Sequence, residues 1–412
     1  MVQNRIPNRG ALLTRRVMLG VGAGALLAGC SSAGSTSSMA PAAGIAVTGT
    51  AGGADVLSAS LAPVKVAVLL PLGKGGEAAK IATDIKQAGE MALFEMNQPT
   101  VALSFKDTQG TPAGAAAAAD EAIREGAELV IGPIFAGEVA AVAPIARQAN
   151  VPVIAFSTDR KVAGNGVYLL SFLVNDEVAR IVSYAAAAQK VNFAAFVPDT
   201  AYGTLVEQAF QANVAASGGR VIAVERYPAD PNAMAEPIVR LRDALQRADA
   251  AGTPADALLL PGAQDMLPTI APLLAYNGLD PRTLKLLGTA GWDYQTIGQE
   301  ATLVGGWFAA PDPAGWRDFA LRYTKTYGAQ PARIASLGFD AVSLALALST
   351  GAPGERYSAM NLSRASGFAG TDGLFRLRAD GTSERGLAVH EVQKFGPRVI
   401  DAAPSSFNVA QF

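Results

Sequence analysis

A regular alternation of short apolar runs and helical stretches, which begins at Val64 and extends to Trp292, restricts the fold of this chain more than any other feature. The apolar runs are long enough for buried strands, and each stretch between them is long enough for a right-handed crossover helix. Such an order predicts parallel sheets that are covered by helices on both faces. The expected strands cover residues 64–72, 101–108, 127–133, 151–158, 192–200, 220–228, 255–262 and 284–292, and the expected helices cover 76–97, 112–126, 137–149, 176–190, 203–217, 234–249 and 264–277.

The expected strands fall into two series, so the pattern predicts two doubly wound α/β sheets in tandem. In such sheets the ligand-binding loops follow the carboxyl ends of the strands. The tail of the chain differs, with expected helices near residues 314–328 and 331–350. Residues 374–395 then alternate between apolar and polar side chains around a turn at Ala379-Asp380-Gly381, which predicts a β-hairpin.

The composition excludes several kinds of chemistry. The 412 residues include one cysteine, Cys30, and one histidine, His390, so a disulfide framework and a Cys/His zinc site are excluded. The net charge of −2 gives no general attraction to nucleic acid or anionic lipid. Neither a pair of catalytic carboxylates nor a nucleophile with its base is recognisable in the sequence. We therefore expect a protein that is not an enzyme and needs no cofactor or metal.

The N-terminus is typical of an exported protein. Four arginines precede the uncharged residues 17–28, which as a helix would span only ~18 Å and cannot cross a membrane. The run Leu27-Ala28-Gly29-Cys30 resembles the lipobox of bacterial lipoproteins. That resemblance implies a signal peptide at residues 1–29 and lipidation of Cys30. A generic signal peptide with an incidental cysteine is the alternative.

The segment after the cysteine is rich in Ser, Ala, Gly and Thr, so residues 30–62 are expected to be a flexible tether. The run Thr14-Arg15-Arg16-Val17-Met18-Leu19 also resembles a twin-arginine export signal, which leaves the Sec and twin-arginine routes both open. The expected location is the periplasmic side of a bacterial membrane, inner or outer.

Several short motifs in the folded part occur in the order that is found in one protein family. These include Pro71-Leu72-Gly73, Ile131-Gly132-Pro133, Tyr202-Gly203 and Phe339-Asp340-Ala341-Val342. Over about residues 64–400 the chain resembles the leucine-binding-protein type of periplasmic binding protein, also called type 1. This resemblance implies two α/β lobes joined by a hinge of three crossings, with a ligand cleft between them.

The same resemblance implies boundaries for the two lobes. The first lobe would comprise residues 64–173 and 307–352, and the second would comprise 174–306 and 353–400. The crossings would then fall near Val174, near Trp307 and after Gly351.

The expected ligand site departs from that of the amino-acid-binding members. Those members hold the ligand carboxylate with hydroxyls after two strands and its ammonium with an acid after the last strand of the second lobe. Here a hydroxyl is missing at Ala136, Ser157 and Thr158 supply hydroxyls, and Ala290 replaces the acid, with Asp293 close by. The residues expected at the cleft are Leu72, Asp107, Phe135, Ala136, Ser157, Thr158, Tyr202, Asp265 and Trp292. For the aspartates the alternative is a turn or helix cap, and for the aromatic residues it is core packing.

Two functions remain open at this stage. The family's commonest role is to receive a small polar solute, such as an amino acid, for an ABC permease. The runs at residues 69–72, 287–292 and 306–312 also resemble penicillin-binding-protein activator lipoproteins, which implies a peptidoglycan synthase as partner. The best-known members of that subgroup carry an N-terminal helical-repeat domain, which residues 31–62 cannot form.

Replacement of the expected lipid acceptor tests the lipoprotein hypothesis. In Cys30→Ser the thiol that would carry the lipid is absent, so we expect the protein to move from the membrane fraction to the soluble fraction of cells. The neighbouring Ser32→Ala is the matched control and should stay with the membranes. Continued membrane association of Cys30→Ser would contradict the hypothesis.

Overall fold

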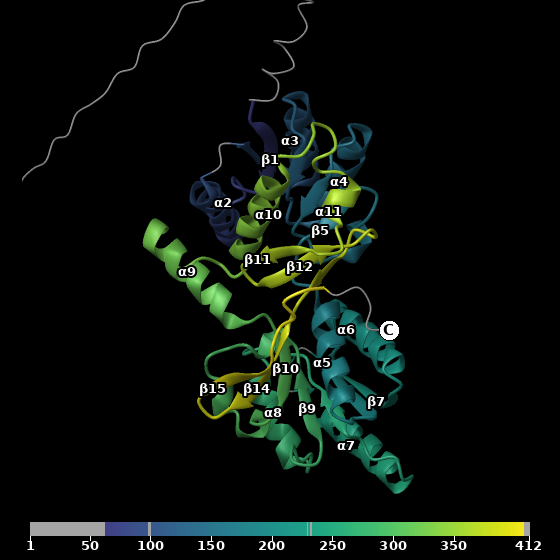
Figure 1. Ribbon diagram of the computed structural model, residues 1–412. Helices are drawn as coiled ribbons and strands as arrows, with labels where there is room; N and C mark the ends of the chain where they lie inside the picture. Colours follow the sequence, from purple (N-terminus) through teal and green to yellow (C-terminus); the bar gives the residue numbers. More distant parts are fainter. Residues whose placement is uncertain (1–61, 98–99, 229, 231–232, 408–412) are drawn as a thin grey trace, which may run out of the picture. The chain divides into compact units, whose positions relative to one another are not determined.

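The computed structural model describes residues 62–97, 100–228, 230 and 233–407 (Figure 1). Every described residue belongs to one compact unit, which lies within Ser58–Phe412. The expected signal peptide, Cys30 and almost all of the expected tether lie outside the described residues, so their assignment stays a prediction.

The first sheet is a parallel sheet of the expected kind, with the strand order β2-β1-β3-β4-β5. Three helices follow its strands in sequence, as predicted. A short strand, β5, was not predicted. The elements are β1 (Val64–Leu70), α2 (Gly76–Met96), β2 (Val101–Asp107), α3 (Pro112–Arg124), β3 (Leu129–Ile131), α4 (Ala136–Gln148), β4 (Val153–Ala155) and β5 (Val167–Leu169).

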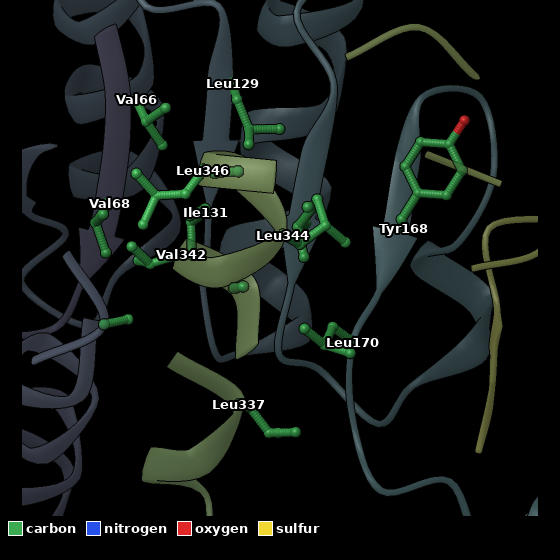
Figure 2. Packing of buried hydrophobic residues seen from close by; sticks show 14 of the residues in the cluster. Val66, Val68, Leu129, Ile131, Tyr168, Leu170, Leu337, Val342, Leu344 and Leu346 are labelled. Atoms are coloured by element: carbon green, nitrogen blue, oxygen red, sulfur yellow. The ribbon is translucent and has the colours of Figure 1, made fainter. Parts of the chain in front are cut away.

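Alternation along β1 shows why helices cover both faces of this sheet. Val66 and Val68 point into one apolar cluster, which α2 and the later helix α10 (Ala335–Leu348) complete, as Figure 2 shows. Ala67 and Leu69 point the other way, into a cluster formed with α3 and α4. A valine or leucine side chain contributes roughly 1.5–3 kcal/mol when fully buried. Helices are therefore required on both faces.

The second sheet combines five parallel strands with two antiparallel ones, in the order β15-β14-β10-β9-β8-β6-β7. Its faces are covered by α7 and α8 on one side and by α5 and α6 on the other. The elements are α5 (Val174–Ala187), β6 (Asn192–Pro198), α6 (Ala201–Ala216), β7 (Arg220–Tyr227), α7 (Ala235–Ala250), β8 (Ala257–Leu259), α8 (Leu267–Tyr276), β9 (Lys285–Gly288), β10 (Trp307–Ala310), β14 (Ala388–Gln393) and β15 (Gly396–Asp401).

The C-terminal part packs mostly on the first sheet. Figure 1 shows α10 beside α2, and the small antiparallel sheet β11-β12-β13 adds its apolar side chains to the same cluster. The predicted turn near Asp380 joins β12 to β13, where Leu377 pairs with Ser383. The elements are α9 (Pro313–Tyr327), α10, α11 (Ala359–Leu362), β11 (Phe368–Gly370), β12 (Gly373–Leu377) and β13 (Ser383–Arg385).

The expected hairpin at residues 374–395 is only half correct. Its second arm leaves β12 after Arg385, and the following strand β14 joins the second sheet beside β10, where Phe308 pairs with His390. The alternating pattern there comes from three strands, of which β12 and β13 lie in the small sheet and β14 in the second sheet. A pairing partner far away in the chain cannot be read from local alternation.

Two expected boundaries between the lobes differ from the structure. Residues 307–310, expected in the first lobe, form β10 of the second sheet, because β10 pairs with β9 and β14. Residues 353–385, expected in the second lobe, pack with the first, because Leu362, Phe368 and Phe375 lie in its core cluster. The chain thus passes between the two sheets at residues 170–173, 311–312 and 386–387.

No helix in the described part of the chain is both long and apolar enough to span a membrane.

The Tyr-Gly motif provides a test of how tightly α6 packs against β6. A Cβ atom on Gly203 would lie 1.8 Å from the Pro198 carbonyl oxygen, so Gly203→Ala must displace the start of α6. We expect a loss of roughly 2–4 kcal/mol in the free energy of unfolding, measured by chemical denaturation. Gly137→Ala in the first turn of α4 is the matched control. Its Cβ would meet only Pro112 Cγ at 3.6 Å, so this variant should be neutral or slightly stabilised. Equal effects of the two substitutions would contradict this packing argument.

Candidate functional site

The loops at the carboxyl edge of the first sheet are tied together by Asp107. Its carboxylate Oδ1 accepts hydrogen bonds from the Gly73 N–H at 3.0 Å and from the Gln109 N–H at 2.9 Å. A Cβ atom on Gly73 would lie 2.5 Å from the other carboxylate oxygen, so glycine is needed there. Asp107 therefore forms turns, which was the alternative to ligand binding, and the nearby Leu72 packs partly buried against the core.

The Ile-Gly-Pro motif turns the chain from β3 toward α4. Gly132 has a φ of +85°, and a Cβ there would lie 2.2 Å from the Leu69 carbonyl oxygen. The turn leads to Phe135, whose ring is 36% exposed and lies 4.4 Å from Lys74 Nζ, and to the half-buried Ala136 that begins α4. Phe135 thus offers a partly open aromatic surface beside a cation.

The two hydroxyl residues after β4 differ in their surroundings. Ser157 is buried, and its Oγ accepts a hydrogen bond from the Asp159 N–H at 3.1 Å. Thr158 is exposed. The serine therefore shapes the turn, while Thr158 leaves its hydroxyl accessible at the carboxyl edge of the sheet.

A cavity of about 390 Å³ opens at the carboxyl edge of the second sheet. It contains two residues predicted for the ligand site, Tyr202 and Asp265, and two that the sequence did not indicate, Tyr227 and Met266. Its volume is within the range of small-molecule pockets. The remaining lining residues are Pro198, Thr200, Gly262, Ala263 and Gly291.

Tyr202 is the most accessible aromatic side chain of this cavity. It is 41% exposed, and its hydroxyl lies 3.2 Å from the buried Thr289 Oγ1. Burial of the hydroxyl raises the pKa of Tyr202 to about 12, so it stays protonated at neutral pH. Tyr227 is buried and donates to the Pro261 carbonyl at 2.9 Å, which fixes the floor of the cavity.

The prediction that Trp292 lines the cleft is wrong. Its side chain is fully buried, its indole N–H donates to the Leu260 carbonyl at 2.9 Å, and its ring packs near Phe308. Gly288 and Gly306 make room for the ring, because a Cβ on either would lie within 2.7 Å of it. Trp292 is a core residue of the second lobe, which was the alternative interpretation.

Glu177 supplies the acid that the sequence seemed to lack. Its carboxylate Oε2 accepts a hydrogen bond from the Ala290 N–H at 2.9 Å, so the acid reaches the position where the motif has alanine. It belongs to the first turn of α5, beside Asp176. Because an acid at that place in a helix is common, no sequence signal indicates that Glu177 reaches the loop after β9.

The electrostatic surroundings distinguish Glu177 from Asp293. Burial raises the pKa of Glu177 to about 7, the Ala290 N–H partly opposes this rise, and the neighbouring Asp176 adds to it. No lysine, arginine or histidine of the described chain forms an ion pair with it. Burial also raises the pKa of Asp293, but the charges of His390, Arg333 and Arg317 oppose that rise. Glu177 is therefore the acid without a cationic partner.

Within the described residues, no cluster of three or more His, Cys, Asp or Glu side chains could hold a metal ion.

The sequence matches the family described as periplasmic binding protein over residues 63–397. A putative branched-chain amino acid ABC transporter protein from Rhodospirillum rubrum has a TM-score of 0.70 at 19% identity, with 82% of this chain and 100% of that chain covered. None of the curated proteins matches the sequence significantly.

Two structures of similar proteins contain ligands. An ABC transporter substrate-binding protein from Desulfitobacterium hafniense, in complex with Leu, has a TM-score of 0.57 at 18% identity, with 82% of this chain and 100% of that chain covered. A solute-binding protein from Rhodopseudomonas palustris BisB5, in complex with 3,4-dihydroxybenzoic acid, has a TM-score of 0.54 at 18% identity, with 83% and 99% covered. At such identities the likeness shows the fold alone.

The raised pKa of Glu177 predicts a pH-dependent stability. Between its ordinary value of 4.5 and its folded value of about 7, the folded state binds more protons than the unfolded state. The free energy of unfolding therefore falls as pH rises through this window, by at most about 1.4 kcal/mol per pH unit for one group. Glu177→Gln cannot ionise, so we expect its stability relative to the native protein to increase from pH 5 to pH 8.

The measurement is chemical denaturation at several pH values, which compares each variant with the native protein. Glu77→Gln, on an exposed first turn of α2, is the control and should show a difference that does not grow in this way. A pH-independent difference for Glu177→Gln would contradict the assignment.

Proposed function

Because the chain belongs to the periplasmic binding protein family, whose members are non-enzymatic, extracytoplasmic solute-binding proteins, we propose that it receives a small amino-bearing solute, such as an amino acid, for an ABC importer. The candidate site consists of Glu177, Tyr202 and the 390 Å³ cavity on the second lobe, with Thr158 and Phe135 on the first.

The observation that carries this proposal is the carboxylate of Glu177 without a cation. A carboxylate that is largely removed from water loses free energy unless a positive charge or several hydrogen bonds compensate it. Here the described protein provides one backbone N–H. An ammonium group of a ligand would supply the missing charge, and it would favour the ionised form of Glu177.

The other groups fit the rest of such a solute. The accessible hydroxyl of Thr158 can donate to a ligand carboxylate. The rings of Tyr202 and Tyr227, with the side chain of Met266, offer an apolar wall for a side chain. A solute with an anionic head and no amine, such as the dihydroxybenzoate of the R. palustris protein, would leave Glu177 unpaired. We therefore favour the ligand class of the D. hafniense protein, which was solved with Leu.

The proposal also includes the export route, the membrane anchor and the partner of the protein. The protein would be exported by the Sec or twin-arginine route, anchored by a lipid at Cys30, and would present its solute to an ABC permease. The resemblance to cell-wall activators remains a prediction without further support. Two of the residues that carry it, Trp292 and Phe308, are fully buried in the second lobe, so these two are not available to a peptidoglycan synthase.

Ligand binding tests the proposal directly. We expect leucine or a related aliphatic amino acid to raise the thermal midpoint of the purified protein by several degrees at about 100 times its dissociation constant, where linkage adds about 2.7 kcal/mol. Glu177→Gln should weaken this binding at least tenfold, because the ammonium loses its counter-charge. The exposed Glu77→Gln is the matched control and should bind as the native protein does.

A deaminated analogue makes the test more specific. 4-Methylpentanoate keeps the carboxylate and side chain of leucine but lacks the amine, so it should bind weakly and respond little to Glu177→Gln. If benzoates bound more tightly than every amino acid, or if Glu177→Gln left amino-acid affinity unchanged, the proposed ligand class would be wrong.

A further inference from the structure

A second hollow lies on the described part of the chain, apart from the candidate site. It consists of two adjoining cavities of about 650 and 390 Å³ that share Asp176, Ala179, Asn213 and Arg378. One wall comes from α5 and α6, which lie side by side (Figure 1), and the other comes from the β12–β13 hairpin and from residues 401–407. None of its lining residues belongs to the cavity that contains Tyr202. We call it the hairpin groove.

The charges on the walls of the hairpin groove do not balance. Five arginines line it against three carboxylates, although the whole chain has a net charge of −2. The residues that line the two cavities therefore carry more positive than negative charge. The arginines are Arg160, Arg180, Arg376, Arg378 and Arg385, and the carboxylates are Asp176, Glu384 and Asp401.

Two of the arginines compete for one carboxylate oxygen. Glu384 Oε2 accepts from Arg376 Nε at 2.7 Å and from Arg378 Nη2 at 2.9 Å. Glu384 is thus shared by two guanidinium groups, although the charges of Asp176 and Asp380 also act on Arg378. The side chains of Arg376 and Arg378 remain 28% and 45% exposed. Each guanidinium carries five donors in a planar fork, so donors remain available to an oxyanion.

Two carboxylates that do not line the cavities offset part of this excess, because Asp340 lies near Arg385 and Asp380 acts on Arg160 and Arg378. Arg180 forms a pair with Asp401 at 2.6 Å, which is a balanced contact. Asp176 accepts from the Arg385 N–H at 3.1 Å and is held in place by backbone. The Arg385 guanidinium lies 3.9 Å from Asp340, and its buried Nε and Nη2 have no hydrogen-bond partner.

We propose that the hairpin groove is a binding site for a small multivalent oxyanion, with carboxylate or phosphate groups, held by Arg376 and Arg378. Bidentate contacts between a guanidinium and an oxyanion are strong and geometrically specific. The volume suits a metabolite larger than a single phosphate ion. Because the walls come from helices of the second lobe and a hairpin packed on the first, a bound oxyanion would join the two lobes beside the crossing at residues 386–387.

Calorimetric titration of the purified protein with pyrophosphate and with citrate tests this proposal. We expect saturable binding of at least one probe, at an ionic strength held constant with sodium chloride. Arg376→Gln combined with Arg378→Gln should raise the dissociation constant at least tenfold. The matched control removes two exposed arginines elsewhere, Arg124→Gln with Arg282→Gln, and should change it less than twofold.

A second pair of variants keeps the test decisive if the double arginine variant fails to fold. Ala216→Glu adds a carboxylate at an exposed position on the wall of the hairpin groove, whereas Ala215→Glu adds the same charge at an exposed neighbour that does not line it. We expect only Ala216→Glu to weaken binding, by at least fivefold. Absence of saturable binding by both probes at millimolar concentration, or equal affinities in Ala216→Glu and Ala215→Glu, would overturn the proposal. Either result would leave the proposed amino-acid site unaffected, because that site shares none of these residues.

Discussion

Burial on both faces of the parallel strands is the constraint on which the rest of this structure depends. Along β6, Phe193 and Phe196 point to opposite sides of the sheet and both are fully buried, each in its own apolar cluster. A strand of this kind cannot face water on either side, so helices must return over both faces. The connections then leave every parallel strand at the same edge. The groups at that edge, among them Thr158 and Tyr202, are free of the packing that fixes the core, and so they can serve recognition.

The same constraint explains which parts of the fold were predictable. The helices and most parallel strands follow from local apolar periodicity, because each strand is buried by its own sequence neighbours. β10 and β14 were misassigned because their partners are remote: Phe308 pairs with His390, more than 80 residues later. The expected strand at residues 127–133 is shortened to β3 for a different reason. At Gly132 the chain takes a positive φ and leaves the sheet.

The candidate site was partly predictable for similar physical reasons. Tyr202 and Asp265 follow strands whose ends share one edge, and the structure brings them to one cavity. Trp292 follows such a strand too, but two glycines leave space for its ring in the core. The ring is buried there, because burial of its large apolar surface is favourable in free energy. Glu177 could not be found, since its sequence position is that of an ordinary acid in the first turn of a helix. Only the approach of α5 to the loop after β9 gives it a different role.

The first turn of α5 connects the two proposed sites. It follows directly after the crossing at residues 170–173 and carries two acids that diverge. Asp176 accepts from the backbone of Arg385, next to the crossing at 386–387, and Glu177 accepts from the backbone of Ala290, at the candidate site. Burial raises the pKa of both to about 7, and each is reached by a backbone N–H. The helix N-terminus favours negative charge at both positions, which offsets part of the cost of burial. A hinge motion that moves α5 must therefore alter both contacts together. A cation bound at Glu177 would lie at the same helix turn whose Asp176 lines the hairpin groove.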